Sequence, residues 1–495
     1  MNFTSFHFVF FFFTTLILGH VLKGRPQRAF LLAASYYFYG VFEPYYLVLI
    51  LFSTAWDYLA GMAITARRDW ENRGGAQGFL ARLPAKTYLV ASVLINLALL
   101  GYFKYTNFGI TILNDVHPLG STMFAFPAEI ILLPVGISFY TFQSMSYTID
   151  VYRGVLEARK DPIDFALYVT FFPQLVAGPI VRATTFLQQL DEGYNIRKND
   201  IIVGVTRIIV GFFRKLVLSD NLAPVVNQVF SNPGAYGTVD IWVASFAFGW
   251  QIYLDFAGYT DIARGVARLF GYEFEINFLY PMAASSITDH WSRWHISLTT
   301  WIRDYVFIPL GGSRVGPVRV YVNIAIVWLA TGIWHGAAYH FVAWGVWQFV
   351  MIAAHRVYGT TALGQRLKQS GSLIYNIASR VFLFFCLSFG FIWFRAPDMI
   401  TANLMHGRQF GFENLNESLV FNSALFSHNQ LKDLGEYIVL LGLLWFYEIF
   451  FNRYQLEYFW KPENRKKLIG ILIAMIYMII AMTPAETPNF LYFQF

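Results

Sequence analysis

The segment Asp289-His290-Trp291-Ser292-Arg293-Trp294-His295-Ile296-Ser297-Leu298 is dense in aromatic, imidazole and charged side chains. A second short segment, Thr331-Gly332-Ile333-Trp334-His335-Gly336, follows it. Both lie in a chain that is otherwise mostly apolar. Ionisable groups are costly at membrane depth, and where they cluster they usually face a cavity and serve chemistry or transport. We therefore expect the function to centre on His295 and His335.

Composition indicates a membrane protein independently of these segments. The chain has 495 residues, of which 56% are hydrophobic and only 13% are charged. A soluble domain carries about 25% charged residues. The 51 Phe, 30 Tyr and 14 Trp are also numerous, and aromatic side chains gather at membrane interfaces. We expect one polytopic membrane domain over residues 1–495.

Apolar windows of about 20 residues, the length that spans a bilayer, recur along the chain. They predict an all-α integral membrane protein with roughly 11 to 13 membrane-embedded helices. Windows that are short or interrupted by Pro and Gly are expected to be re-entrant or buried. The windows are 3–22, 28–42, 45–64, 87–106, 128–148, 164–181, 201–218, 240–258, 318–334, 338–356, 374–394, 434–451 and 467–484.

The net charge of +6 is explained by basic cytoplasmic loops, and no basic soluble domain suggests nucleic-acid binding. The single cysteine, Cys386, excludes an intramolecular disulfide and a cysteine-based metal site.

The apolar run 8–18 has no Lys or Arg before it, whereas Lys23 and Arg25 follow it. This order is the reverse of a signal peptide and favours a first helix with its N-terminus outside.

Aromatic and apolar side chains recur at helical spacing between residues 291 and 305. We expect one interfacial or re-entrant amphipathic helix there, with His295 on its aromatic face. His295 could serve catalysis or make a structural hydrogen bond. Ser297 stands two positions away, and residues i and i+2 of a helix do not face each other. A covalent serine intermediate is therefore not expected.

His335 lies beside Gly332 and Gly336, a small-xxx-small pair that lets another helix backbone approach closely. A neutral imidazole in such a place can take a proton from a hydroxyl and return it. An interhelical hydrogen bond is the alternative role. No His-Glu-x-x-His, Walker A or Gly-x-Ser-x-Gly motif occurs, so we expect no metal site, nucleotide hydrolysis or serine hydrolase chemistry.

Several motifs together closely resemble the membrane-bound O-acyltransferase (MBOAT) family, in the branch of the alginate O-acetyltransferase membrane subunit. The resemblance covers essentially the whole chain. The matching stretches are Pro134-Val135-Gly136-Ile137-Ser138-Phe139, Phe171-Phe172-Pro173-Gln174-Leu175-Val176-Ala177-Gly178-Pro179-Ile180, Asp255-Phe256-Ala257-Gly258-Tyr259-Thr260-Asp261, Trp294-His295-Ile296-Ser297-Leu298, Trp301-Ile302-Arg303-Asp304-Tyr305, Ile308-Pro309-Leu310-Gly311-Gly312, Trp334-His335-Gly336 and Phe490-Leu491-Tyr492-Phe493-Gln494-Phe495.

This resemblance implies two family histidines, matching His295 and His335, with the histidine of Trp-His-Gly as the catalytic one. The family pattern before the first motif is Asp-Phe-Trp-Arg-Arg-Trp-His, and here His290 and Ser292 replace Phe and Arg. These two departures from the family pattern leave the identity of the substrate undetermined. The motif residues expected to support the histidines are Trp294, Ser297, Arg303, Asp304 and Trp334.

The resemblance also implies a bundle with re-entrant or interfacial helices around a central tunnel, in a bacterial inner membrane. The acyl donor would be a cytoplasmic thioester, for which we expect acetyl-CoA as a substrate with no bound cofactor. The acceptor would be an extracytoplasmic polysaccharide such as alginate, reached directly or through periplasmic SGNH-type acetyltransferase or esterase-like partners. Arg or Trp N–H groups near the histidines would stabilise the oxyanion.

Two other functions fit the sequence. A polytopic transporter or export channel would use the histidines as a proton relay or gate. A scaffold that only anchors a glycan-modifying complex would need neither histidine for acetylation.

Loop charge predicts the topology. Basic residues crowd into 66–86 and 452–467, whereas 398–433 holds only Arg408 and Lys432. The positive-inside rule places the first two loops in the cytoplasm and the third outside. Single cysteines introduced into a Cys386→Ala background and treated with a membrane-impermeant reagent in intact cells should label only in 398–433. Strong labelling within 66–86 would contradict this topology.

Overall fold

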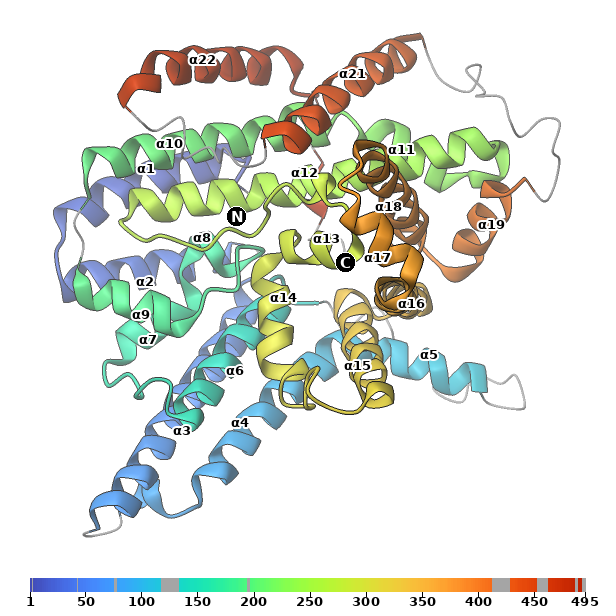
Figure 1. Ribbon diagram of the computed structural model, residues 1–495. Coiled ribbons are helices and arrows are strands. Elements are labelled where there is room, and N and C mark those ends of the chain that lie inside the picture. Colours follow the sequence, from blue (N-terminus) through green and yellow to red (C-terminus); the bar gives the residue numbers. More distant parts are fainter. Residues whose placement is uncertain are drawn as a thin grey trace. The chain divides into compact units, whose positions relative to one another are not determined.

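The computed structural model describes residues 1, 3–41, 43–74, 78–116, 133–193, 196–411, 428–451, 462–485 and 488–491. Within these ranges all regular secondary structure is helical (Figure 1), which confirms the predicted all-α fold. The chain forms two compact units, one of residues 1–208 with 262–275 and one of 209–261 with 276–495. Parts of the loops used for the topology prediction (75–77, 412–427 and 452–461) lie outside the described residues.

The first unit holds the helices up to residue 208 of α10, together with the end of α12. Many predicted windows correspond to these helices within a few residues. They are α1 (Phe6–Val21), α2 (Arg25–Gly40), η1 (Pro44–Tyr46), α3 (Leu47–Arg73), η2 (Phe79–Ala81), α4 (Ala85–Leu100), the π-helix η3 (Gly101–Tyr105), α5 (Thr106–Val116), α6 (Ile137–Arg153), α7 (Pro162–Thr170), α8 (Phe172–Leu175), α9 (Ala183–Glu192) and α10 (Lys198–Phe212).

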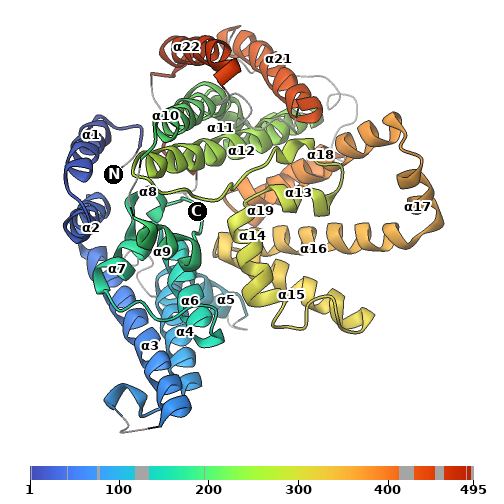
Figure 2. The same ribbon diagram turned by 60° about the vertical axis from the view of Figure 1, so that its left-hand side comes forward.

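A buried polar cluster joins α3 to α4, and Figures 1 and 2 show these helices side by side with α6. Asp57 is fully buried and accepts hydrogen bonds from Ser92 Oγ at 2.6 Å and Asn96 Nδ2 at 2.9 Å. Ser53 Oγ donates to Asn96 Oδ1 at 3.0 Å. Polar contacts of this kind hold helices together where lipid offers no hydrophobic driving force.

The window 164–181 is not one helix. α7 ends at Thr170, Phe171 leaves the helical conformation, and α8 covers only four residues. Pro173 is the second residue of α8 and has no backbone N–H, so it cannot continue the hydrogen-bond ladder of α7. Both pieces are too short to span and are buried, as expected for a window interrupted by Pro and Gly.

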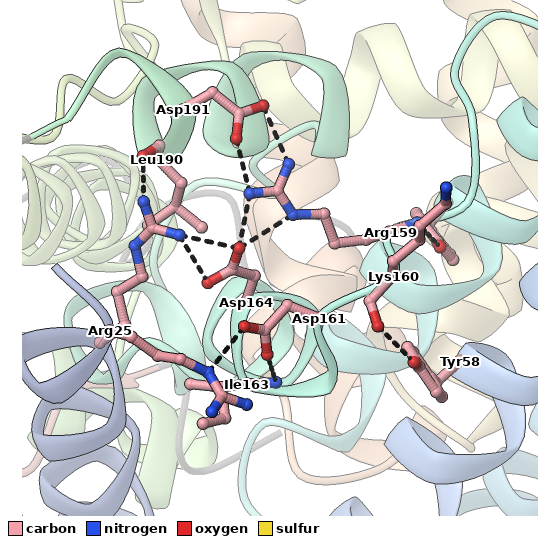
Figure 3. A network of polar contacts seen from close by, with 11 residues as sticks. Arg25, Tyr58, Arg159, Lys160, Asp161, Ile163, Asp164, Leu190 and Asp191 are labelled. Carbon is pink, nitrogen blue, oxygen red and sulfur yellow. Dashed lines mark hydrogen bonds and ion pairs between the residues drawn. The ribbon is translucent and has the colours of Figure 1, made fainter.

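A network of charges fixes α7 to α2 and α9 (Figure 3). Asp164 on α7 is 1% exposed and accepts from Arg28 Nη1 at 2.9 Å and from Arg159 Nη2 at 2.5 Å. Arg159 also pairs with Asp191 at 2.6 Å, and this hydrogen bond lowers the pKa of the Asp191 carboxyl. Arg25 pairs with Asp161 nearby, at a more exposed position.

The second unit contains the remaining helices. They are the π-helix η4 (Phe213–Ser219), α11 (Ala223–Ser231), η5 (Pro233–Ala235), α12 (Thr238–Leu269, through Asp261), η6 (Pro281–Ala283), α13 (Ile287–Arg293), α14 (Ile296–Ile302), the π-helix η7 (Arg303–Phe307), α15 (Pro317–His335), α16 (Tyr339–Thr360), α17 (Ala362–Gln369), α18 (Leu373–Arg395), α19 (Met399–Gln409), α21 (His428–Phe451), η10 (Pro462–Asn464) and α22 (Arg465–Met482).

Buried charges on η4 and α12 neutralise one another in this unit. Lys215 Nζ lies 2.6 Å from Asp255 Oδ1 and 2.7 Å from Asp220 Oδ1, and all three side chains are at most 2% exposed. Arg214 pairs with Asp261 at 2.5 Å. A buried charge is retained only when it is paired. These ion pairs therefore have a structural role.

Four helical stretches among the described residues are long and apolar enough to cross a membrane: 44–72, 85–116, 317–335 and 373–395. Two shorter apolar helices, 6–21 and 438–449, approach that length. These helices fit a multi-pass membrane protein. The predicted total of roughly 11 to 13 embedded helices, the single domain over 1–495 and the central tunnel stay predictions.

The charge network makes a prediction about stability. Asp164→Ala leaves two arginines without their shared buried carboxylate, and such a loss costs about 3–5 kcal/mol. We expect a clear fall in the midpoint of thermal unfolding in detergent. Arg25→Ala is the matched control, because its pair with Asp161 is 66% and 29% exposed and exposed pairs contribute about 0–1 kcal/mol. Equal shifts for the two variants would contradict the assigned role of Asp164.

Candidate functional site

The helix expected through 291–305 is interrupted near its start, so that prediction is wrong in this respect. α13 ends at Arg293 and α14 begins at Ile296. Between them His295 adopts the left-handed conformation, with φ 43° and ψ 53°. For a residue other than glycine this conformation costs roughly 1–2 kcal/mol. Strain of this size persists only where the surroundings enforce it, and such places cluster at functional sites.

Asn277 supplies the contacts that hold this break. Its backbone carbonyl accepts from Ile296 N at 2.9 Å, and its side-chain Oδ1 accepts from Ser297 N at 3.1 Å and Ser297 Oγ at 2.9 Å. The same Oδ1 lies 3.2 Å from His295 Nδ1. Asn277, His295 and Ser297 are at most 2% exposed. Two oxygens of one buried residue, Asn277, therefore organise the start of α14.

These contacts determine which ring nitrogen of His295 carries the proton. The backbone N–H of Ser297 can only donate, so the atom of Asn277 that faces it is the carbonyl oxygen. An oxygen can only accept, so His295 Nδ1 is the protonated nitrogen in this contact. In the neutral ring, Nε2 is then the basic nitrogen. This arrangement suits a general base that acts through Nε2.

Ser297 is closer to His295 than its sequence spacing suggested. Ser297 Oγ lies 3.5 Å from His295 Nδ1. The expectation that the two side chains do not face each other is wrong, because His295 precedes α14 and is not part of a continuous helix. Ser297 Oγ nevertheless donates to Asn277. Its observed contact is therefore a structural one.

His335 is the last residue of α15, and the predicted close contact beside it is confirmed at Gly332. A Cβ at Gly332 would lie 2.4 Å from the Phe341 carbonyl oxygen and 3.2 Å from Gly345 Cα of α16. At Gly336 it would lie 1.9 Å from the Phe341 ring. α15 and α16 therefore lie side by side (Figure 2) with backbone against backbone next to the imidazole.

A small cavity lies beside His335. The cavity volume is about 10 Å³, which is room for about one water-sized group. Its walls come from α12, α13, α15, α16 and α18, together with Trp294. The lining residues are Ile252, His290, Trp291, Trp294, His335, Trp344, Gln348, Leu387, Phe391 and Phe394.

Aromatic rings connect the two histidines. The Trp334 ring lies 6.3 Å from the His295 ring and 4.9 Å from the His335 ring, measured between centroids. Trp344 and Phe394 meet the His335 ring edge-on at 5.2 and 5.1 Å. His335 itself is 7% exposed. The structure thus gathers Trp294, His295, Ser297, Trp334 and His335 in one buried region of the second unit.

Arg303 and Asp304 occupy a different kind of position. Arg303 Nε donates to Asp304 Oδ1 at 2.7 Å, and the two side chains are 58% and 32% exposed. Both lie on η7, beyond the end of α14. Their expected support of the histidines stays a prediction.

Sequence reasoning missed several residues of this region. Asn277, Trp344 and Gln348 were not selected, and His290 was noted only as a departure from the family pattern. The His290 ring stacks on Trp294 at 5.4 Å, and its Nδ1 lies 3.2 Å from the Pro281 carbonyl oxygen. For Asn277 the only sequence signal was a polar residue in an apolar segment. Its contact with His295 spans 18 positions and required the fold.

Comparison with known proteins finds one matching family and several similar proteins. The profile of the MBOAT, membrane-bound O-acyltransferase, family matches residues 155–394. The probable alginate O-acetylase of Pseudomonas putida is 38% identical over 83% of this chain and 81% of its own length. The peptidoglycan O-acetyltransferase of Helicobacter pylori is 29% identical over 80% of this chain and 77% of its own length. The teichoic acid D-alanyltransferase of Streptococcus thermophilus is 30% identical over 43% of this chain and 54% of its own length.

The Asn277 contacts predict the tautomer of His295. In protein labelled with ¹⁵N-histidine, the His295 signals should show a protonated Nδ1 and an unprotonated Nε2, with His295→Gln used for assignment. Asn277→Leu removes the acceptor, so the preference for a protonated Nδ1 should weaken. Asn277→Asp keeps an oxygen at this place and should keep Nδ1 protonated. A His295 that carries its proton on Nε2 in the unaltered protein would contradict the prediction.

Proposed function

The chain belongs to the membrane-bound O-acyltransferase family, and on this basis we propose that it acetylates hydroxyl groups of an extracytoplasmic polysaccharide. It is a multi-pass membrane acyltransferase. The relatives named for alginate and peptidoglycan O-acetylation support a sugar hydroxyl as the acceptor. Alginate is the polymer that most relatives' names favour.

The proposed donor is a cytoplasmic thioester, acetyl-CoA, bound as a substrate. A thioester carries an activated acetyl group, so the protein needs to supply a base, an oxyanion site and orientation rather than a bound cofactor. His335 is the proposed general base that takes the proton of the acceptor hydroxyl. His295, with its basic nitrogen at Nε2, is the proposed second histidine of the site.

One observation carries this proposal: His335 lies at the end of α15 and lines a small buried cavity among aromatic rings. Inside such a cavity little water competes with an acceptor hydroxyl for the acyl group. The cavity has room for about one water-sized group, which leaves no space for a long acyl chain and favours a short one. The close backbone contact at Gly332 holds the imidazole in place.

The remaining parts of the proposal concern location and partners. We place the protein in the bacterial inner membrane, with the donor on the cytoplasmic side and the polymer outside. Periplasmic SGNH-type proteins of the same pathway would complete transfer to the sugar, so the immediate acceptor is either the polymer or a hydroxyl of such a partner. A neighbouring gene for a secreted SGNH-type protein would support this arrangement.

The role of His335 predicts a large loss of activity without loss of protein. His335→Ala removes the base, and general-base catalysis contributes roughly 10²–10⁴-fold. Acetyl content of the secreted polymer should therefore collapse while immunoblots show normal membrane abundance. Purified protein should likewise lose the release of free thiol from acetyl-CoA. His295→Ala should also reduce activity, together with some loss of folded protein, because His295 is packed into the strained break before α14.

His340→Ala is the matched control, because His340 is also buried on a neighbouring helix but contacts the Trp393 carbonyl at 2.7 Å. It should retain acetylation. Normal acetylation by His335→Ala at wild-type abundance would remove His335 from catalysis. Polymer acetylation without any thioester turnover by the purified protein would instead favour the transporter or scaffold alternatives.

A further inference from the structure

Two residues of α16 that carry side-chain N–H groups line the His335 cavity. Trp344 and Gln348 both line this cavity and are 3% and 1% exposed. They stand four positions apart, so they share one face of the helix. The Trp344 ring also lies 5.2 Å from the His335 ring. Both side chains therefore lie close to the proposed base.

The contact between Gln348 and Trp291 fixes the orientation of the Gln348 amide. Trp291 Nε1 lies 3.3 Å from Gln348 Oε1. An indole N–H can only donate, so the amide atom that faces it is the oxygen. The Nε2 amide group therefore points to the other side of the side chain. Among the described residues, none accepts a hydrogen bond from Gln348 Nε2.

Trp344 also carries a buried N–H donor. Its Nε1 is fully buried, and within the described ranges no group accepts from it. Most buried polar groups have a hydrogen-bond partner, and leaving a buried donor unsatisfied costs about 1–3 kcal/mol. Trp344 Nε1 is such a donor, and Gln348 lines the same cavity one helical turn away. An acceptor atom that enters the cavity with the substrate would complete the hydrogen bonding of Trp344 Nε1.

We propose that Gln348 Nε2 and Trp344 Nε1 form the oxyanion hole of the acyl transfer. In this role both residues are catalytic. The inference rests on the proposed function, since it assumes that an acyl thioester reacts beside His335. The carbonyl oxygen of the thioester would accept hydrogen bonds from these two donors. An oxyanion hole needs preorganised donors in a site that excludes water. The Trp291 contact provides this preorganisation for Gln348.

The resulting reaction is balanced. The acceptor hydroxyl oxygen forms a bond to the carbonyl carbon while its proton passes to His335. Negative charge develops on the carbonyl oxygen, where Gln348 and Trp344 donate. Collapse of this intermediate breaks the carbon–sulfur bond, and the leaving sulfur takes the proton from His335. The products are an ester and a free thiol, and His335 returns to its neutral form.

Substitutions on α16 test the proposal. Trp344→Phe keeps an aromatic ring and removes only the indole N–H, and Gln348→Leu removes the amide. The rate is the release of free thiol from acetyl-CoA by purified protein, with acetyl content of the polymer as a second readout. Loss of one oxyanion donor lowers kcat by about 10²–10³-fold. KM for acetyl-CoA and the thermal midpoint should change little, a split that a merely structural role would not produce.

Trp347→Phe is the matched control on the same helix. Its indole N–H donates to the Cys386 carbonyl at 3.0 Å, and Trp347 is not among the cavity residues. This variant should keep kcat within a few-fold of the wild-type value. Wild-type kcat in Trp344→Phe and in folded Gln348→Leu would overturn the oxyanion assignment while leaving the proposed function intact. Absence of thioester turnover in the wild-type protein would instead overturn the proposed function.

Discussion

A chain embedded in lipid must satisfy its polar groups from within, because no water is available at that depth. This constraint is most demanding where a helix is interrupted. At the break before α14, one residue, Asn277, accepts the hydrogen bonds of Ile296 and Ser297 and contacts His295 as well. The strained conformation of His295 therefore depends on a single buried amide. The position and protonation of the imidazole follow from it.

Sequence alone could predict the helices but not their interruptions. Thirteen apolar windows were expected, and most correspond to helices because hydrophobicity and length are local properties. The break at His295 was missed. Windows interrupted by Pro and Gly were expected to be re-entrant or buried, but the position of the break at Phe171 was not predicted. Each break is stabilised by contacts between segments distant in sequence, such as Asn277 with Ser297. Spacing rules assume a continuous helix, and they failed where that assumption failed.

The candidate site was predictable in part for a related reason. His295 and His335 stand out because imidazoles are unusual in apolar segments and because they match a family motif. Gln348 and Trp344 lack such a signal, since a tryptophan or a single glutamine on an apolar helix is ordinary. Their interest arises only from a shared cavity and from the Trp291 contact. The structure thus adds residues whose role depends on geometry rather than type.

Gly332 brings two backbones together beside His335, with no side chain between them. Such a contact has no rotamers to adjust, so the end of α15 is held by backbone rather than by the side chains of the cavity wall. Leu387 and Phe391 of α18 form another part of that wall. Under the proposed function, changes in the size of these two side chains would alter the room for the acyl group without displacing the proposed base. Selectivity for the acyl chain could then evolve while the residue proposed for the chemistry stays in place.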